Sequence, residues 1–377
     1  MVDSLTVIIA PDSFKGSVTA GAAASAISEG WMQARPDDTV ILLPQADGGE
    51  GTLDAIEAAT PTAVRHRVGP VTGPDGRPTP GEFLELPHRE AVVELAQCSG
   101  LPLMREPDAL HATTRGLGEV IRSANEAGMR SIVIALGGSA STDGGSGALA
   151  ALGLGLLDSR DSALQDGGGA LVSLERVTTD GLLPPPPDGV TLLADVTAPL
   201  LGKNGAARVF GPQKGADADG IRILEAGLSR LAAVLGGDPD APGSGAAGGT
   251  AYGFTTLWGA TVTSGARTVQ RLTGLSEAIA TADVVITGEG RFDASSATGK
   301  VVGELLALAA GHGVRTGVIA GQVAAPTTAW TCALAELAGS AEAALADPMQ
   351  HLERAGREAA EYFGSGFDTR RTLPDQR

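Results

Sequence analysis

The 377-residue chain has a formal net charge of −17, two cysteines and an aromatic content of only 3%. A nucleic-acid-binding protein needs clustered cations, and an acidic membrane surface would repel this chain, so we expect neither partner. Two cysteines without metal-type spacing fit a reducing compartment. The first apolar run, Leu5–Ala10, is too short for a signal peptide, so we expect a cytoplasmic protein.

Length and composition favour two α/β domains. A chain of this length exceeds what one hydrophobic core usually fills. Hydrophobic residues make up 43% of the sequence while aromatics are scarce, so Ala, Val, Leu and Ile must form the cores. That composition suits helices packed on a parallel sheet better than a β-sandwich.

Four segments share one pattern, in which a short apolar run leads into a loop with glycines and a charge. The runs predicted as strands are Leu5–Ala10, Val40–Leu43, Ile132–Leu136 and Val284–Thr287. The stretches predicted as helices after the loops are Ala20–Trp31, Thr52–Ala59, Ala148–Gly153 and Val301–Ala310. Parallel sheets bind ligands outside the carboxyl ends of their strands, so we expect the four loops to converge on one cleft.

The remaining segments indicate a second module. Arg65–Val93 alternates extended pieces with turns such as Gly73–Gly76, which predicts antiparallel strands. Asp347–Phe363 is predicted to be an amphipathic closing helix. We assign residues 1–60, 108–159 and 281–377 to a discontinuous parallel-sheet domain, and residues 61–107 and 160–280 to an inserted α/β domain.

Lysine is rare, and its positions are informative. Only four of the 27 basic residues are lysines, and each has a glycine within two positions: Lys15, Lys203, Lys214 and Lys300. An ammonium group beside a loop that lets backbone approach suits phosphate or carboxylate binding. A role as ordinary solvent-facing turn residues is the alternative for each.

The loop Gly137–Gly147 is the best candidate for a phosphate cradle. It combines glycines, hydroxyls and one Asp between a predicted strand and a helix start. Consecutive amides and a helix N-terminus bind anions there. Its spacing is not the G-x-G-x-x-G dinucleotide fingerprint, and Ala294–Val301 fails as a P-loop at both ends. We predict that this cradle holds the phosphates of a nucleotide. The predicted nucleotide-binding residues are Gly137, Gly138, Ser139, Ser141, Thr142, Gly144, Gly145 and Lys214.

Carboxylates at strand ends complete a site for phosphoryl transfer, which needs a metal, cations and a proton acceptor. Candidates are Asp12, Asp47, Glu50, Asp143, Asp195, Glu289 and Asp293. Asp195, which closes the run Val190–Ala194, is our first choice as general base. An N-cap or turn role is the alternative for each of them.

At these loops the sequence resembles the bacterial type I glycerate kinases. Six signatures carry the resemblance in the expected order over residues 5–322: Ile9–Ser17, Ala46–Thr52, Gly137–Gly145, Asp195–Thr197 with Pro199–Gly202, Val209–Gly215 and Ile286–Arg291. The sequence departs from the family pattern at Gln97-Cys98 and at Ser295-Ser296.

The resemblance implies transfer of the γ-phosphate of ATP to glycerate with Mg²⁺. It also implies a flavodoxin-like domain, into which a domain resembling restriction endonucleases is inserted, with the active site between the two. We predict catalytic roles for Asp195 and Lys15. We predict substrate binding by Asp12, Ser13, Lys15, Arg291 and Lys300, and metal binding by Asp47, Glu50 and Asp293.

Two other functions stay open at this point. A nicotinamide-dependent oxidoreductase of a small hydroxy acid would act on similar substrates, although the dinucleotide fingerprint is absent. A non-catalytic sensor of small acids would bind ligand without turnover. Oligomeric state and the hydroxyl that receives the phosphate do not follow from the sequence.

Overall fold

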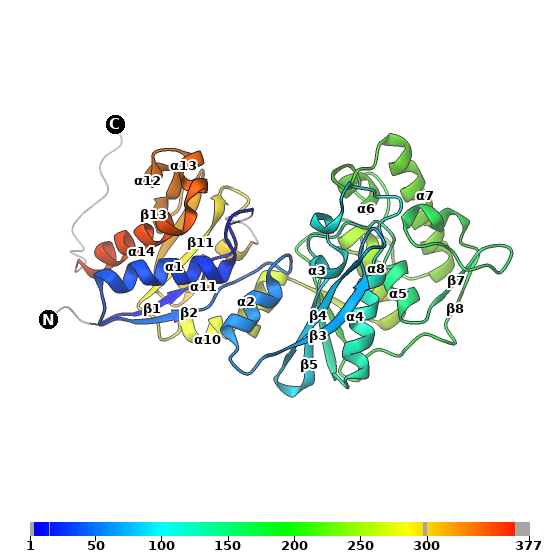
Figure 1. Ribbon diagram of the computed structural model, residues 1–377, viewed down its shortest axis with the longest axis horizontal. Coiled ribbons are helices and arrows are strands. Elements are labelled where there is room, and N and C mark those ends of the chain that lie inside the picture. Colours follow the sequence, from blue (N-terminus) through cyan, green and yellow to red (C-terminus); the bar gives the residue numbers. More distant parts are fainter. Residues whose placement is uncertain (1–3, 15, 297–299, 366–377) are drawn as a thin grey trace. The chain divides into compact units, whose positions relative to one another are not determined.

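The computed structural model describes residues 4–14, 16–296 and 300–365, and its elements form two compact units (Figure 1). The terminal unit comprises Met1–Gln45 and Gln270–Arg377, and the central unit comprises Ala46–Val269. The central unit therefore lies between two parts of the terminal unit in sequence. No helix in the described part of the chain is long and apolar enough to cross a membrane.

The terminal unit contains a five-stranded parallel sheet in the order β13-β12-β11-β1-β2. Its strands are β1 (Thr6–Ile9), β2 (Thr39–Leu42), β11 (Val284–Phe292), β12 (Arg315–Val323) and β13 (Trp330–Ala333). Its helices are α1 (Ala20–Ala34), α10 (Leu275–Ile279), α11 (Val301–Gly311), α12 (Leu334–Ala338), α13 (Ala341–Ala346) and α14 (Pro348–Gly364). This is the flavodoxin-type strand order of a doubly wound sheet.

Continuous apolar runs along these strands bury both faces of the sheet. Val7 and Ile9 pack with Ile27 and Trp31 of α1 and with Leu352 and other residues of α14. In a second cluster, Phe292, Val318 and Ala320 of the strands pack against Val302 of α11. Helices thus cover the sheet on both sides, as the apolar composition predicts.

The central unit contains a mixed six-stranded sheet in the order β10-β9-β6-β5-β4-β3, together with a two-stranded sheet. Its strands are β3 (Val64–Thr72), β4 (Pro78–Leu86), β5 (Glu90–Glu94), β6 (Ser131–Ala135), β7 (Gly155–Leu157), β8 (Arg176–Thr178), β9 (Val190–Leu193) and β10 (Thr261–Thr263). Its helices are α2 (Thr52–Ala59), α3 (Leu95–Ser99), α4 (Arg115–Glu126), α5 (Ser146–Ala151), α6 (Ala206–Phe210), α7 (Ala218–Leu235) and α8 (Ala246–Trp258). Helix α9 (Gly265–Leu272) spans the boundary between the units.

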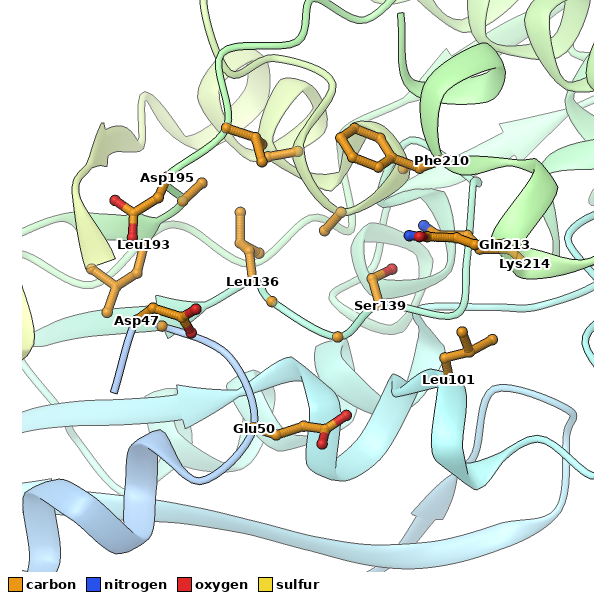
Figure 2. A pocket seen from close by; sticks show the side chains of 18 of the residues that line it. Asp47, Glu50, Leu101, Leu136, Ser139, Leu193, Asp195, Phe210, Gln213 and Lys214 are labelled. Carbon is orange, nitrogen blue, oxygen red and sulfur yellow. The ribbon is translucent and has the colours of Figure 1, made fainter. Parts of the chain in front are cut away.

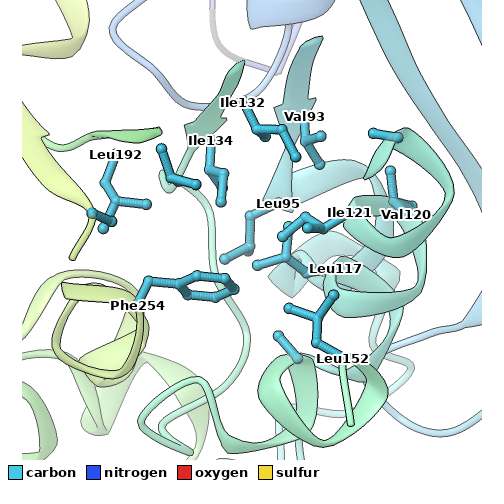
Figure 3. Close-up of a cluster of buried hydrophobic side chains, with 14 of the residues drawn as sticks. Val93, Leu95, Leu117, Val120, Ile121, Ile132, Ile134, Leu152, Leu192 and Phe254 are labelled. Carbon is cyan, nitrogen blue, oxygen red and sulfur yellow. The ribbon is translucent and has the colours of Figure 1, made fainter. Parts of the chain in front are cut away.

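The core of the central unit lies between this sheet and its helices (Figure 3). Leu117, Val120 and Ile121 of α4 pack with Val93 of β5 and Ile132 of β6. All five side chains are fully buried. Strands β5, β6, β9 and β10 run parallel, so their carboxyl ends lie along one edge of the sheet. That edge positions the site described below.

The predicted α/β class is confirmed, and so are several individual elements. Helix α2 begins and ends where the sequence predicts, and α14 follows Asp347, whose side chain caps it. The pieces within Arg65–Val93 form the antiparallel pairs β3–β4 and β4–β5.

The division into units differs from our prediction. Residues 46–60 and 108–159 lie in the central unit, because β6 pairs with β5 and β9 rather than with the five-stranded sheet. A continuous apolar run predicts a strand that is buried on both faces. It does not predict which other strands pair with it.

Candidate active site

A pocket of about 460 Å³ lies at the carboxyl edge of the six-stranded sheet (Figure 2). This volume is in the usual range for small-molecule sites. Every lining residue belongs to the central unit: Asp47, Gly48, Glu50, Leu101, Pro102, Leu136, Gly137, Gly138, Ser139, Leu193, Ala194, Asp195, Val196, Phe210, Gln213, Lys214, Ala246, Ala247 and Gly248.

The ends of two adjacent parallel strands supply the floor of the pocket. Strand β6 leads into Gly137 and Gly138, and β9 leads into Asp195. The loop with Asp47 packs directly on Gly137, whose amide donates to the carbonyl of Gly48 at 2.9 Å. A Cβ at Gly137 would lie 2.5 Å from the Cα of Gly49, so only glycine permits this contact.

Lys214 is the buried cation of the pocket. It ends the 3₁₀ turn Pro212–Lys214, and it is 3% exposed. Its Nζ donates to the carbonyl oxygen of Ser141 at 2.5 Å. Burial lowers the pKa of Lys214 to about 8, although the nearby charge of Asp143 acts in the opposite direction. An ammonium has three N–H donors, and the bond to Ser141 uses one of them.

Asp47 and Asp195 line the opposite side of the pocket from Ser139, Gln213 and Lys214 (Figure 2). Asp195 Oδ1 accepts the amide hydrogen of Gly265 at 3.0 Å, at the start of α9. Surrounding protein atoms disfavour the charged form of Asp195 and raise its pKa, and the charge of Asp47 adds to this effect. Hydrogen bonds from Ser264 and from the Gly265 and Ala266 amides partly oppose it. Asp195 therefore combines a helix-capping role with a place in the pocket wall.

The rest of the predicted phosphate loop lies behind the pocket. Ser141 and Thr142 are fully buried and do not line it. Gly144 and Gly145 adopt positive φ angles of 66° and 76°, and they pack against α7 and α8. Ser141 nevertheless contacts two side chains of the pocket, because its carbonyl oxygen accepts from Lys214 Nζ at 2.5 Å and from Ser139 Oγ at 3.3 Å.

Asp143, a carboxylate candidate, organises this loop. Its oxygens accept hydrogen bonds from the Thr114 amide and hydroxyl at 3.0 and 2.8 Å, and from the amides of Gly145 and Gly147 at 3.1 and 3.2 Å. Complete burial raises the pKa of Asp143. Its partners are those of a turn-forming and helix-capping residue, which is the alternative that the sequence left open.

The other predicted residues lie at the carboxyl ends of strands in the terminal unit. Asp12 follows β1, where its Oδ1 accepts from the Ser13 amide at 2.6 Å, and its own amide donates to Gly288 at 2.8 Å. These strands meet at the point where the strand order reverses, which is where doubly wound sheets bind ligands. Lys15 lies outside the described residues.

Three further predicted residues cluster near the end of β11. Arg291 Nη1 donates to Gln322 at 3.2 Å, and its Nε lies 3.7 Å from an Asp293 oxygen. Lys300 Nζ donates to Ser295 Oγ at 2.9 Å. Hydrogen bonds from the Ser295 hydroxyl and amide lower the pKa of Asp293.

Sequence reasoning missed one wall of the pocket. Residues 246–248 line it, and Ala247, Gly248 and Gly249 have positive φ angles of 51°, 64° and 89°. A non-glycine residue in this region is strained, and such strain concentrates at functional sites. The glycine-rich run Gly243–Gly249 is the signal that could have identified this turn. Phe210 and Gln213, which also line the pocket, shortly precede the predicted Lys214 in the chain.

The geometry defines an α/β protein with a pocket in which a glycine loop and a buried lysine face two carboxylates (Figure 2). The sequence profile of the glycerate kinase family matches residues 7–364. The chain therefore belongs to the glycerate kinase family.

Individual relatives agree with this assignment. Glycerate 2-kinase of Escherichia coli strain K12 is 42% identical over 306 residues, which cover 79% of this chain and 80% of that protein. Glycerate kinase of Bacillus subtilis strain 168 is 41% identical over 312 residues, with coverages of 78% and 79%. A crystal structure assigned as glycerate kinase 2 from Salmonella typhimurium LT2 superimposes with a TM-score of 0.81 at 34% identity, covering 97% of this chain and 99% of that one.

Proposed function

We propose that this chain transfers the γ-phosphate of ATP to a hydroxyl of glycerate, and that it is a glycerate kinase of the bacterial type I. The observation that carries the proposal is one pocket in which Lys214 and a glycine loop face Asp47 and Asp195. Phosphoryl transfer needs this combination of cation, backbone amides and carboxylates. The family assignment favours a kinase over an oxidoreductase or a small-acid sensor.

ATP would lie across the pocket with its phosphates at the glycine loop. Because the Gly137 amide is already bonded to Gly48, the amides of Gly138 and Ser139 are our candidates for phosphate binding. Lys214 would add positive charge at the same place. The apolar side chains of Leu101, Pro102 and Phe210 then offer a surface for the base.

Asp195 would accept the proton of the attacking hydroxyl. Its raised pKa makes it a better proton acceptor than an ordinary aspartate. The capping bond from Gly265 fixes the carboxyl group, so little rearrangement is needed during the reaction.

Magnesium fits the carboxylate side of the pocket. No group of three or more His, Cys, Asp or Glu among the described residues could hold a metal by itself. Mg²⁺, however, is commonly held by one or two carboxylates together with substrate phosphates. Asp47, with Glu50 at the margin of the pocket, would hold it. When bound, the ion would neutralise phosphate charge during transfer.

Glycerate binding by Asp12, Ser13, Lys15, Arg291 and Lys300, and metal binding by Asp293, stay predictions. They can be separated from nucleotide binding by kinetics. Substitution of a glycerate-binding residue should raise KM for glycerate and leave KM for ATP near that of the wild type.

The deciding experiment is release of ADP by the purified protein in the presence of glycerate, ATP and Mg²⁺. We expect ADP only when all three are present. Enolase added to the product identifies the position of transfer, because it consumes 2-phosphoglycerate directly. We expect 2-phosphoglycerate, as the name of the relative from E. coli suggests. No glycerate-dependent ADP would overturn the proposed function.

A further inference from the structure

Helix α2 begins without a capping side chain from its own segment. Its N-cap is Gly51, with φ of 83° and no side chain to accept a hydrogen bond. The first amides of a helix need acceptors, which Ser, Thr, Asp or Asn at the N-cap usually provides. Here Glu94, the last residue of β5, provides them from another part of the chain.

Both carboxylate oxygens of Glu94 take part. Oε1 accepts from the Gly51 amide and Oε2 accepts from the Leu53 amide, each at 3.1 Å. Glu94 is 3% exposed. Glutamate is almost never buried to this degree unless it is paired, and the positive end of a helix is a favourable partner.

The electrostatic surroundings make this position costly for a carboxylate. Burial, together with the charges of Asp54 and Glu50, raises the pKa of Glu94 to about 7 against the effect of the two amide bonds. The two hydrogen bonds from the Gly51 and Leu53 amides offset the cost of burying Glu94.

The segment that Glu94 holds forms one wall of the pocket. Asp47, Gly48 and Glu50 line the pocket and directly precede Gly51. The Gly137 amide fixes the segment near its start through Gly48. Glu94 fixes it at its end, so the wall is held between two neighbouring strands, since Glu94 pairs in register with Ala135.

We propose that Glu94 is a positioning residue for phosphoryl transfer, which fixes the Asp47–Glu50 wall by holding the amides of Gly51 and Leu53. It does not itself line the pocket. The inference rests on the proposed function, because the wall matters only if Asp47 and Glu50 serve the bound nucleotide and its metal.

The test compares Glu94→Gln and Glu94→Ala with a matched control. Gln keeps the size and one acceptor oxygen, whereas Ala removes both acceptors. Glu119→Gln makes the same change at a carboxylate that accepts the Thr72 amide at 2.7 Å but does not line the pocket. We expect kcat/KM for ATP to fall by roughly 10-fold in Glu94→Gln and about 100-fold in Glu94→Ala, the range for residues that orient ligating groups.

Two readouts separate positioning from a loss of stability. The Mg²⁺ concentration for half-maximal rate should rise in both Glu94 variants, while KM for glycerate stays within about twofold of the wild type. Hydrogen–deuterium exchange of residues 48–54 should accelerate selectively, with no reaction needed. Glu119→Gln should show neither change.

The inference would be overturned by unchanged kinetics and Mg²⁺ dependence in both Glu94 variants. It would also be overturned by exchange that accelerates over the whole central unit with activity falling only as the folded fraction falls. If the wild type makes no phosphoglycerate, the proposed function fails instead. The exchange of residues 48–54 still decides whether Glu94 holds the wall.

Discussion

The ammonium of Lys214 and the carbonyl of Ser141 are hydrogen-bonded although the two residues are 73 positions apart in the chain. This bond connects the segment that follows α6 to the glycine loop that follows β6. It places a cation with a lowered pKa at the wall of the pocket, where Ser139 and Gln213 also lie. We expect the charge of Lys214 to strengthen ATP binding. The burial of that charge disfavours the folded state.

Replacement of this lysine should reduce activity without reducing stability. Lys214→Met removes a buried charge whose desolvation disfavours the folded state. We expect KM for ATP to rise by at least about 10-fold, the equivalent of one charge-assisted hydrogen bond. The melting temperature at pH 7 should equal or exceed that of the wild type. Lys203→Met, at an exposed lysine outside the pocket, is the control and should change neither quantity.

The pH dependence of ATP binding should show the titration of Lys214. Its pKa in the folded protein is about 8, so its charge is present below that pH and lost above it. Affinity for ATP should therefore weaken as pH rises through about 8. Lys214→Arg should retain affinity at higher pH, because a guanidinium stays protonated. An unchanged alkaline decline in Lys214→Arg would show that another group is responsible.

The same titration predicts the sign of the stability change. An unfolded lysine has a pKa near 10.5, so between about 8 and 10.5 the folded state binds fewer protons than the unfolded state. The contribution of Lys214 to the free energy of unfolding should therefore increase with pH across this window. Denaturant titrations of the wild type and of Lys214→Met isolate this contribution. The difference between their free energies of unfolding should shrink as pH rises.

Substitution of the proposed base should affect chemistry more than binding. In Asp195→Asn the amide oxygen can still accept from Gly265, so α9 keeps its cap. We expect kcat to fall by about 10²- to 10⁴-fold, the usual contribution of a general base, with KM for ATP little changed. Asp217→Asn makes the same change at the N-cap of α7, outside the pocket, and should leave kcat unaltered. A near-normal kcat in Asp195→Asn would remove Asp195 from the chemistry.

The contact between Gly137 and Gly49 predicts a loss of stability on adding a single methyl group. Gly137→Ala would place a Cβ 2.5 Å from a backbone atom, and the free energy of unfolding should fall by roughly 1–3 kcal/mol. Gly21→Ala, in helix α1 with open space around the added Cβ, should instead raise it by about 0.5–1 kcal/mol. Chemical denaturation of both variants measures the difference.

The sequence predicts local elements well because each depends on neighbouring residues. The run Thr52–Ala59 has helical periodicity, and Gly73–Gly76 has turn chemistry, so both are readable from a short window. Pairing of strands is different. Ile132–Leu136 is recognisable as a buried strand, but its position between β5 and β9 depends on segments about 40 and 60 residues away.

The residues of the candidate site divide in the same way, into those with a local sequence signal and those whose partners are distant in the chain. Asp47, Glu50, Gly137, Gly138, Ser139, Asp195 and Lys214 stand out in the sequence through their glycine loops, and the structure brings all of them to one pocket. Glu94 gives no such signal, because its partners are the amides of Gly51 and Leu53, which lie 43 and 41 residues earlier in the chain. The left-handed turn at Ala247 differs, because the glycine-rich run Gly243–Gly249 around it is a signal, although alanine itself rarely adopts that conformation.

Phosphorus NMR of a mixture of the protein, ATP, Mg²⁺ and glycerate tests most directly whether the chain phosphorylates glycerate. We predict that the γ-phosphate signal of ATP disappears while one phosphomonoester signal of phosphoglycerate grows in equal amount, and that both changes require glycerate. Loss of the γ-phosphate to inorganic phosphate, or an unchanged ATP spectrum, would contradict the account.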